Sequence, residues 1–301
     1  MPGRAPPGRS TSFAPAHLFP VATLLLSITY ALPVNPPVLP VVPFTQTWGI
    51  LLLALAVGGV TLWAALRRMP DRSRRGVLCG IAIANWGFST WFTFDRIAEP
   101  AFPDFVFSRN WPLHFCTIAT ILLVPAMLVR SGPGAAWWVR PLHALLFFPG
   151  ALAGFLALCA PSAEYIGAPL LSVGALFYLV HGLNVVLPFA HAGLGYYRPR
   201  WRDAALSLVL FTVLAVALFL VTLLARAFVD PRANYMYFFD PEGSAILEAL
   251  WRLIGVPFVY ELPLIPLLYP VLLLMVAGHR AVERAAQAIA ALRARGLGLA
   301  G

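Results

Sequence analysis

The chain contains no lysine, and only 11% of its 301 residues are charged. Its net charge of +9 therefore comes from arginine alone. Hydrophobic residues make up 60% of the sequence, and the mean hydropathy is +0.81. So few charges among such long apolar runs exclude an ordinary soluble domain and indicate a polytopic membrane protein. The arginines cluster between the apolar runs, as topology signals do, which argues against nucleic acid as a partner.

Cysteine is also scarce in this chain. Cys79, Cys116 and Cys159 are too few and too scattered for a metal site or a disulfide framework, and no CxxC or HExxH spacing occurs. The sequence has no nucleotide-binding motif, so we expect neither a metal nor ATP as a cofactor. Two structural interpretations of Cys116 stay open beside a reactive one: a small packing residue, or a disulfide with Cys159.

Seven apolar segments, each close to the ~20 residues that a membrane-spanning helix needs, follow one another along the chain. They predict an all-α fold, a polytopic membrane helix bundle over residues 47–278. Residues 1–46 are expected to form a disordered tail and a proline-bounded hydrophobic segment, whose apolar run 17–32 is short for a span. Residues 279–301 form a basic amphipathic tail that either lies along the anionic inner surface or continues the last helix. The seven segments are 48–66, 77–95, 111–129, 141–160, 168–190, 204–228 and 255–278.

The arginines also predict the orientation of the bundle. Fourteen of the twenty-one fall in alternate links and in the tail that follows the last segment. The positive-inside rule places these links and the C-terminus in the cytoplasm. We therefore expect a multi-pass protein of a cell membrane with a cytoplasmic C-terminus, and membrane lipids as its partners.

One stretch, residues 110–116, brings polar and reactive side chains to the start of an apolar run. Asn110 is a good N-cap and Pro112 fits a first turn, so the helix would hold Cys116 about a turn and a half inside it. The helix dipole fades beyond the first turn and would do little for a thiolate there. His114 is two residues away and would point to the other side of the helix. The base for a Cys116 nucleophile must therefore come from another segment.

Polar residues inside the other segments are costly in a bilayer and so mark candidate functional positions. His181 is the candidate base, with an interhelical hydrogen bond as its structural alternative, and Gly182 beside it permits close approach of a neighbouring helix. Glu261 would orient a histidine, hold a lipid headgroup or pair with an arginine. Most of these groups fall in the outer half of the bundle, which predicts one polar pocket opening outward. Its expected substrate-binding residues are His114, Asn85, Asn184, Asn234, Tyr235, Tyr237 and Glu261. An aromatic belt at the membrane interface is the structural alternative for the tyrosines.

Together these motifs carry a resemblance to a known family. The ordered set Trp111-Pro112-Leu113-His114-Phe115-Cys116, His181-Gly182, Asn234-Tyr235-Met236-Tyr237 and the Glu261 helix resembles the YwaF family of bacterial integral membrane proteins, which is similar to the animal transmembrane protein 164. The likeness covers roughly Trp48 to Gly278. The long proline-rich N-terminal extension departs from the family pattern, as does Phe115, where the family usually has leucine.

The resemblance implies a multi-helix bundle and, from the animal relatives, a cysteine-dependent transfer of fatty acyl groups between phospholipids. Cys116 would match the family cysteine and His181 the family histidine. A thiolate made by His181 would attack a lipid ester, and a lysolipid hydroxyl would resolve the acyl-cysteine. Asn85, Asn234 or Tyr235 would donate to the oxyanion. The alternative is a lipid-binding, transport or scaffold protein in which the same residues bind a headgroup or join helices.

Overall fold

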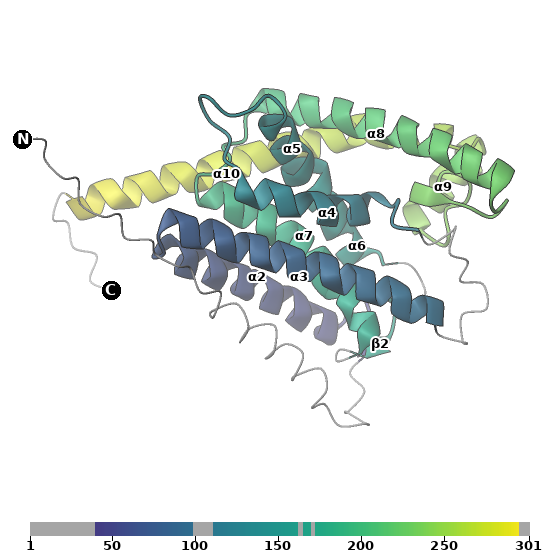
Figure 1. Ribbon diagram of the computed structural model, residues 1–301, viewed down its shortest axis with the longest axis horizontal. Coiled ribbons are helices and arrows are strands. Elements are labelled where there is room, and N and C mark those ends of the chain that lie inside the picture. Colours follow the sequence, from purple (N-terminus) through teal and green to yellow (C-terminus); the bar gives the residue numbers. More distant parts are fainter. Residues whose placement is uncertain (1–39, 99–110, 162–164, 170–171, 295–301) are drawn as a thin grey trace, which may run out of the picture. The chain divides into compact units, whose positions relative to one another are not determined.

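The computed structural model describes residues 40–98, 111–161, 165–169 and 172–294, and these are mainly helical (Figure 1). The predicted all-α class is confirmed for this part of the chain. A two-stranded antiparallel pairing is the exception, in which β1 (Pro40–Val41) lies against β2 (Ala168–Pro169). The tail expected at 1–16, the apolar run 17–32 and the N-cap expected at Asn110 lie outside the described residues.

Five helical segments are long and apolar enough to cross a membrane, as an integral membrane protein requires. Pro149 lies inside one of them, at a π-helical turn, because proline lacks the N–H that a regular α-helical turn would use. The five are α2 (Gln46–Arg67); α5 (Val139–Leu145) with η1 (Leu146–Gly150) and α6 (Ala151–Cys159); η3 (Val173–Ala175) with α7 (Leu176–Gly193); α8 (Trp201–Phe228); and η5 (Val259–Glu261) with α10 (Leu264–Ala294).

The other two predicted spans are helical, but neither is both long enough and apolar enough to cross a membrane. α3 (Asp71–Ala98) is long enough, but it opens with charged residues and carries Asn85 and Ser89 in its middle. α4 (Phe115–Leu128) is apolar, but its 14 residues extend for only about 21 Å, against ~30 Å for the hydrocarbon core of a bilayer. A helical membrane bundle is thus supported, whereas the predicted count of seven full spans is not.

α7 is the helix around which the others pack, since it contacts α2, α3, α4 and α6. One apolar core joins α2, α3, α4 and α7, and a second joins η1, α5, α7, α8 and α10. Glycines permit the closest approaches. A Cβ at Gly182 would lie 2.6 Å from the Leu55 side chain of α2, and one at Gly154 of α6 would lie 2.8 Å from the His181 carbonyl oxygen. The close helix approach expected at Gly182 is therefore confirmed.

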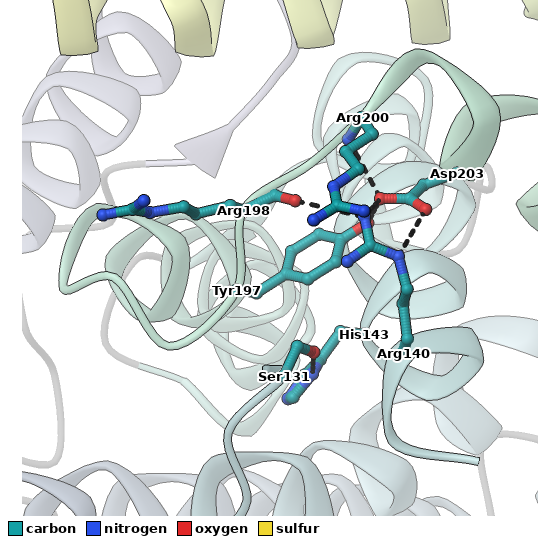
Figure 2. Close-up of polar contacts among 7 residues, drawn as sticks. All are labelled: Ser131, Arg140, His143, Tyr197, Arg198, Arg200 and Asp203. Carbon is teal, nitrogen blue, oxygen red and sulfur yellow. Dashed lines mark hydrogen bonds and ion pairs between the residues drawn. The ribbon is translucent and has the colours of Figure 1, made fainter. Parts of the chain in front are cut away.

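One end of the bundle, where α2 ends and α3, α5 and α8 begin, is here called the arginine-rich end. Its centre is the carboxylate of Asp203, which is bound by both Nε (2.8 Å) and a terminal nitrogen (2.5 Å) of Arg140 (Figure 2). The same carboxylate accepts the hydroxyl of Tyr197 at 3.0 Å and the backbone N–H of Arg200 at 2.9 Å, which caps α8. Burial, and next the Asp203 charge, raise the pKa of Tyr197, so its hydroxyl stays a donor. The ion pair between Arg140 of α5 and Asp203 of α8 joins these two helices.

The chain between α8 and α10 contains a helix that the sequence analysis did not predict, α9 (Ala245–Ile254). It ends at Gly255, whose φ of 62° suits the left-handed cap. Trp251 packs edge-on against Tyr260, with ring centroids 4.9 Å apart. Beyond it, α10 runs past His279 to Ala294 as one helix. The first part of the predicted basic tail therefore continues the last span.

Candidate functional site

α4 begins at Phe115, with His114 as its N-cap, because Trp111 to Leu113 form a turn in which the Leu113 N–H donates to the Trp111 carbonyl at 2.6 Å. Cys116 is thus the second residue of α4, and the prediction that it lies a turn and a half inside the helix is wrong. In the first turn the helix dipole acts most strongly on a charge. The backbone of His114 is extended (φ −71°, ψ 142°), so the helical spacing argument for its direction does not apply either.

A buried hydrogen-bond network holds the backbone of Cys116. The side-chain amide of Asn184 on α7 donates to the Cys116 carbonyl at 3.2 Å and to the Thr120 hydroxyl at 2.9 Å. Thr120 donates to the same Cys116 carbonyl at 2.8 Å. Asn85 on α3 donates to Oδ1 of Asn184 at 3.0 Å. Three helices therefore meet at Asn184, directly beneath the start of α4.

The network contains one buried acceptor to which the described residues donate nothing, Oδ1 of Asn85. The Asn85 side chain is fully buried, so this atom is costly unless a donor reaches it. Its amide nitrogen already donates to Asn184. A primary amide carries two N–H groups, and only one is used among the described residues, so Asn85 has both an acceptor and a donor to offer.

His181 lies one turn before Asn184 on α7. One ring nitrogen, Nδ1, is 2.7 Å from the Phe177 carbonyl, which can only accept, so Nδ1 carries the proton in the neutral ring. Nε2 then keeps its lone pair, as a general base requires. Among the described residues, no hydrogen bond joins His181 to the Cys116 thiol. The two side chains belong to neighbouring turns of α7 and α4 that Asn184 links.

A second cluster lies against the start of α4, and most of its residues belong to the chain between α8 and α10. The His114 ring lies 5.4 Å from the Tyr237 ring and 6.4 Å from the Tyr235 ring, centroid to centroid. Tyr237 belongs to η4 (Tyr235–Tyr237), and its carbonyl accepts the hydroxyl of Tyr260. We call His114, Tyr235, Tyr237, Tyr260 and Glu261 the aromatic cap. It brings Tyr235 and Tyr237 against His114 at the start of α4, and Tyr260, next to Glu261 in the chain, joins them through the Tyr237 carbonyl.

Two buried polar atoms of the aromatic cap have no hydrogen-bond partner among the described residues: the hydroxyl of Tyr235 and Oε1 of Glu261. Burial, and next the charge of Asp230, raise the pKa of Tyr235, so this hydroxyl stays protonated. The cap therefore presents a free donor and a free acceptor. Both suit a polar group of a ligand.

Asn234, by contrast, uses its side chain to fold the link. It donates to the Asp240 carbonyl and to Glu242, each at 2.8 Å, and accepts the Phe239 N–H at 2.8 Å. The link needs this support because Met236, with φ 55°, and Tyr237, with φ 68°, occupy the left-handed region that disfavours side chains. Of the three predicted oxyanion donors, Asn234 has both amide N–H groups committed, whereas the Tyr235 hydroxyl and one N–H of Asn85 are not used among the described residues.

All three cysteines are free thiols, so the disulfide alternative for Cys116 and Cys159 is not present in this structure. Two site residues escaped the sequence analysis. Thr120 follows Cys116 by four residues and so shares its helix face, a spacing that could have revealed it. Gly154 lies against the Asn184 and His181 turns of α7, and nothing in its local sequence signals that contact.

Comparison with known proteins agrees with the resemblance seen in the sequence. Searches of curated proteins and of solved structures found no match. A family model, described as the TMEM164 family, matches residues 43–276, a range that includes α2 and the start of α10 as well as every candidate site residue. The chain belongs to the TMEM164 family.

Proposed function

We propose that this membrane protein transfers acyl groups between phospholipids and lysolipids, with Cys116 as the nucleophile and His181 as the base. The observation that carries the proposal is the position of Cys116. It occupies the first turn of a helix too short to cross a bilayer, between the buried Asn184 network and the aromatic cap. A reactive thiol with polar groups on both sides fits covalent catalysis better than packing does.

The depth of Cys116 favours a lipid substrate. The other end of α4, Leu128, lies at the arginine-rich end, where its carbonyl accepts Arg75 at 3.2 Å. Twelve residues of helix separate Leu128 from Cys116, which is about 18 Å. With Leu128 at one boundary of a hydrocarbon layer of ~30 Å, the thiol lies inside that layer. An ester reaches it most readily as part of a lipid.

The proposed reaction uses the lone pair of His181 Nε2, the Cys116 thiol and the Tyr235 hydroxyl. His181 Nε2 takes the thiol proton, and the Cys116 sulfur attacks the ester carbonyl carbon to form a tetrahedral oxyanion that the Tyr235 hydroxyl stabilises. Collapse breaks the C–O bond, His181 returns the proton to the departing lysolipid, and an acyl thioester remains on Cys116. A second lysolipid hydroxyl gives its proton to His181, attacks the thioester and regenerates the thiol. Proton transfer needs Nε2 and Sγ within roughly 3 Å, or one bridging water.

The Asn184 network supports this role by fixing the nucleophile. Two donors, Asn184 and Thr120, hold the Cys116 carbonyl, so the first turn of α4 cannot fray or rotate freely. A nucleophile held in this way loses little entropy on reaching the transition state. The arginine-rich end then faces the cytoplasm, and the aromatic cap faces the outer side of a bacterial cytoplasmic membrane.

A direct test uses the purified protein in nanodiscs that contain a phospholipid with an isotope-labelled acyl chain and an added lysophospholipid. We expect labelled product and a hydroxylamine-sensitive acyl adduct on the peptide that contains Cys116. Cys116→Ser should lower transfer at least about 100-fold, whereas Cys159→Ser, a matched loss of a partly exposed thiol, should not. Transfer that survives Cys116→Ser would refute the nucleophile.

Lipid binding without catalysis is the second candidate function. It is favoured by the two unpaired buried acceptors, Asn85 Oδ1 and Glu261 Oε1, which suit a hydrogen-bond donor on a bound headgroup. Co-purified lipid that is retained equally by the native protein and Cys116→Ser, with no transfer by either, would support this function instead.

A further inference from the structure

A second pair of side chains with the geometry of a nucleophile and its base lies at the arginine-rich end, at the opposite end of α4 from Cys116. Ser131 is in the connection between α4 and α5, and His143 is on α5 (Figure 2). We propose that Ser131 and His143 form a separate esterase site that cleaves the acyl esters of anionic amphiphiles. This inference does not depend on the acyl transfer proposed for Cys116.

The hydrogen bonds of His143 determine which nitrogen acts as the base. Nε2 lies 3.1 Å from the Ala126 carbonyl, which can only accept, so Nε2 carries the proton of the neutral ring. Nδ1 then presents its lone pair to the Ser131 hydroxyl, 2.6 Å away. A hydroxyl that donates to an imidazole, with the imidazole oriented by a third group, is the arrangement that activates a serine.

The imidazole is rigidly supported on its other faces. His143 is only 3% exposed, and its ring lies 4.7 Å from the His191 ring and 5.5 Å from the Tyr197 ring. Tyr197 is in turn held by Asp203, which Arg140 binds through two nitrogens. Preorganised support of this kind keeps a base in its productive orientation.

The residue after Ser131 supplies the donor that an oxyanion needs. Gly132 is exposed, and its N–H makes no hydrogen bond within the described part of the chain. Gly134 follows with a φ of 79°, a left-handed turn that glycine accommodates without strain. The N–H of the residue that follows a nucleophilic serine is a common oxyanion donor.

The surroundings indicate the class of substrate. A cavity beside the ring, lined by His143, His191 and Tyr197 among others, has room for about 10 Å³, about one water, while Ser131 is partly exposed on the loop side. There the connection exposes Arg130 and two tryptophans, of which Trp137 is 86% exposed. Tryptophan beside arginine suits the interface of an anionic membrane. An ester whose alcohol part carries a negative charge fits this surface.

The reaction balances without a cofactor. Ser131 Oγ attacks the ester carbonyl carbon while its proton passes to Nδ1 of His143. The C–O bond to the alcohol breaks, and His143 protonates the leaving oxygen. Water then gives a proton to His143 and attacks the carbonyl carbon of the acyl-serine. The bond from that carbon to Ser131 Oγ breaks, His143 returns the proton to Oγ, and a carboxylic acid is released.

The test uses full-length Cys116→Ser protein in detergent, so that the thiol cannot contribute. A fluorescent fluorophosphonate should label Ser131, because Oγ displaces fluoride from phosphorus once His143 removes its proton. We expect Ser131→Ala to lower labelling at least tenfold, His143→Gln to do the same, and Ser172→Ala to leave it unchanged. Peptide mass analysis identifies the labelled residue.

Two results would overturn the proposal: no label on Ser131 in folded protein, or equal labelling of Ser131 in His143→Gln, which would show a serine that no base activates. If Ser131→Ala fails to fold, Ser131→Cys replaces it. Its thiol should then react with iodoacetamide at least tenfold faster than Cys159, and an equal rate would count against the base.

Discussion

At the scale of single residues, the candidate site is distinguished by which polar atoms are paired and which are not. Asn184 on α7 bonds to groups on two other helices, α3 and α4, whereas the Tyr235 hydroxyl and Glu261 Oε1 are buried without partners among the described residues. Paired atoms stabilise the fold, while unpaired buried atoms cost free energy that a ligand can recover. The two kinds of residue should therefore respond differently to substitution.

Tyr235→Phe removes a hydroxyl that no described residue uses, so the free energy of unfolding should stay within about 0.5 kcal/mol of the native value. Acyl transfer should nevertheless fall by roughly 10²-fold, the usual cost of losing one oxyanion donor. Tyr178→Phe is the control. It loses bonds to the Val41 and Tyr165 carbonyls and should lower thermal stability more than transfer. Unchanged transfer by Tyr235→Phe would remove Tyr235 from the mechanism.

Asn184→Ala should act on stability first. It breaks the links to Asn85, Thr120 and the Cys116 carbonyl at once, which should cost about 1–3 kcal/mol in thermal unfolding in detergent. Thr212→Val is the control, since among the described residues the Thr212 side chain bonds only to the Leu208 carbonyl of its own helix. An equal loss in both variants would mean that the network adds little to helix association.

At the scale of the helices, the site depends on how closely α6 approaches α7. Gly154 faces the turn between His181 and Asn184, where a Cβ would lie 2.8 Å from the His181 carbonyl oxygen and 3.2 Å from Asn184 Cβ. The first contact is with backbone, which cannot rotate away. The helix pair must separate to accept a larger residue.

We expect Gly154→Ala to destabilise the protein by about 1–3 kcal/mol and to lower acyl transfer with it, because the shift moves the base. Gly87→Ala on α3 is the control: its Cβ would meet nothing within 4 Å, and alanine is the better helix former. Thermal unfolding and transfer measured on both variants decide the point. If Gly154→Ala kept the native stability and transfer rate, the contact between α6 and α7 would not be as close as this prediction requires.

The elements also show what could be predicted. The span predicted at 48–66 corresponds to α2, Gln46–Arg67. It could be predicted because a long uninterrupted apolar run is a direct sequence signal of a membrane-spanning helix. The start of α4 could not be predicted, because a turn at Trp111 to Leu113 displaces the cap from Asn110 to His114. α9 was not predicted because its ten residues are too few for a membrane span, which was the kind of helix that the apolar runs indicated. The Asn184 network rests on contacts between distant segments, which the spacing within one helix does not reveal.

At the scale of the whole molecule, the arginine-rich end and the aromatic cap lie at opposite ends of α4. Arg75 bonds to the last residue of α4, and His114 of the cap precedes its first residue. Positive charge marks the cytoplasmic side of membrane proteins. The distribution therefore gives the bundle a testable orientation.

A reporter tag after residue 294 and a tag in the link 161–167 should lie on opposite sides of the membrane, with the first in the cytoplasm. Protease access in inverted and right-side-out vesicles measures both. The control moves the first tag to the link 69–70 between α2 and α3, which should report the same side as residue 294. Two main tags on one side would show that the number of crossings between them is even.

The length of α10 has a mechanical consequence. Its 31 residues, Leu264–Ala294, extend for about 46 Å, roughly 16 Å more than the hydrocarbon layer is thick. The helix is continuous beyond Pro270, and Arg280 stacks on Trp201 of α8 near the point where α10 leaves the bundle. A continuous helix transmits rotation along its whole length, so a tilt of the membrane-spanning part by a few degrees displaces Ala294 sideways by a few ångströms.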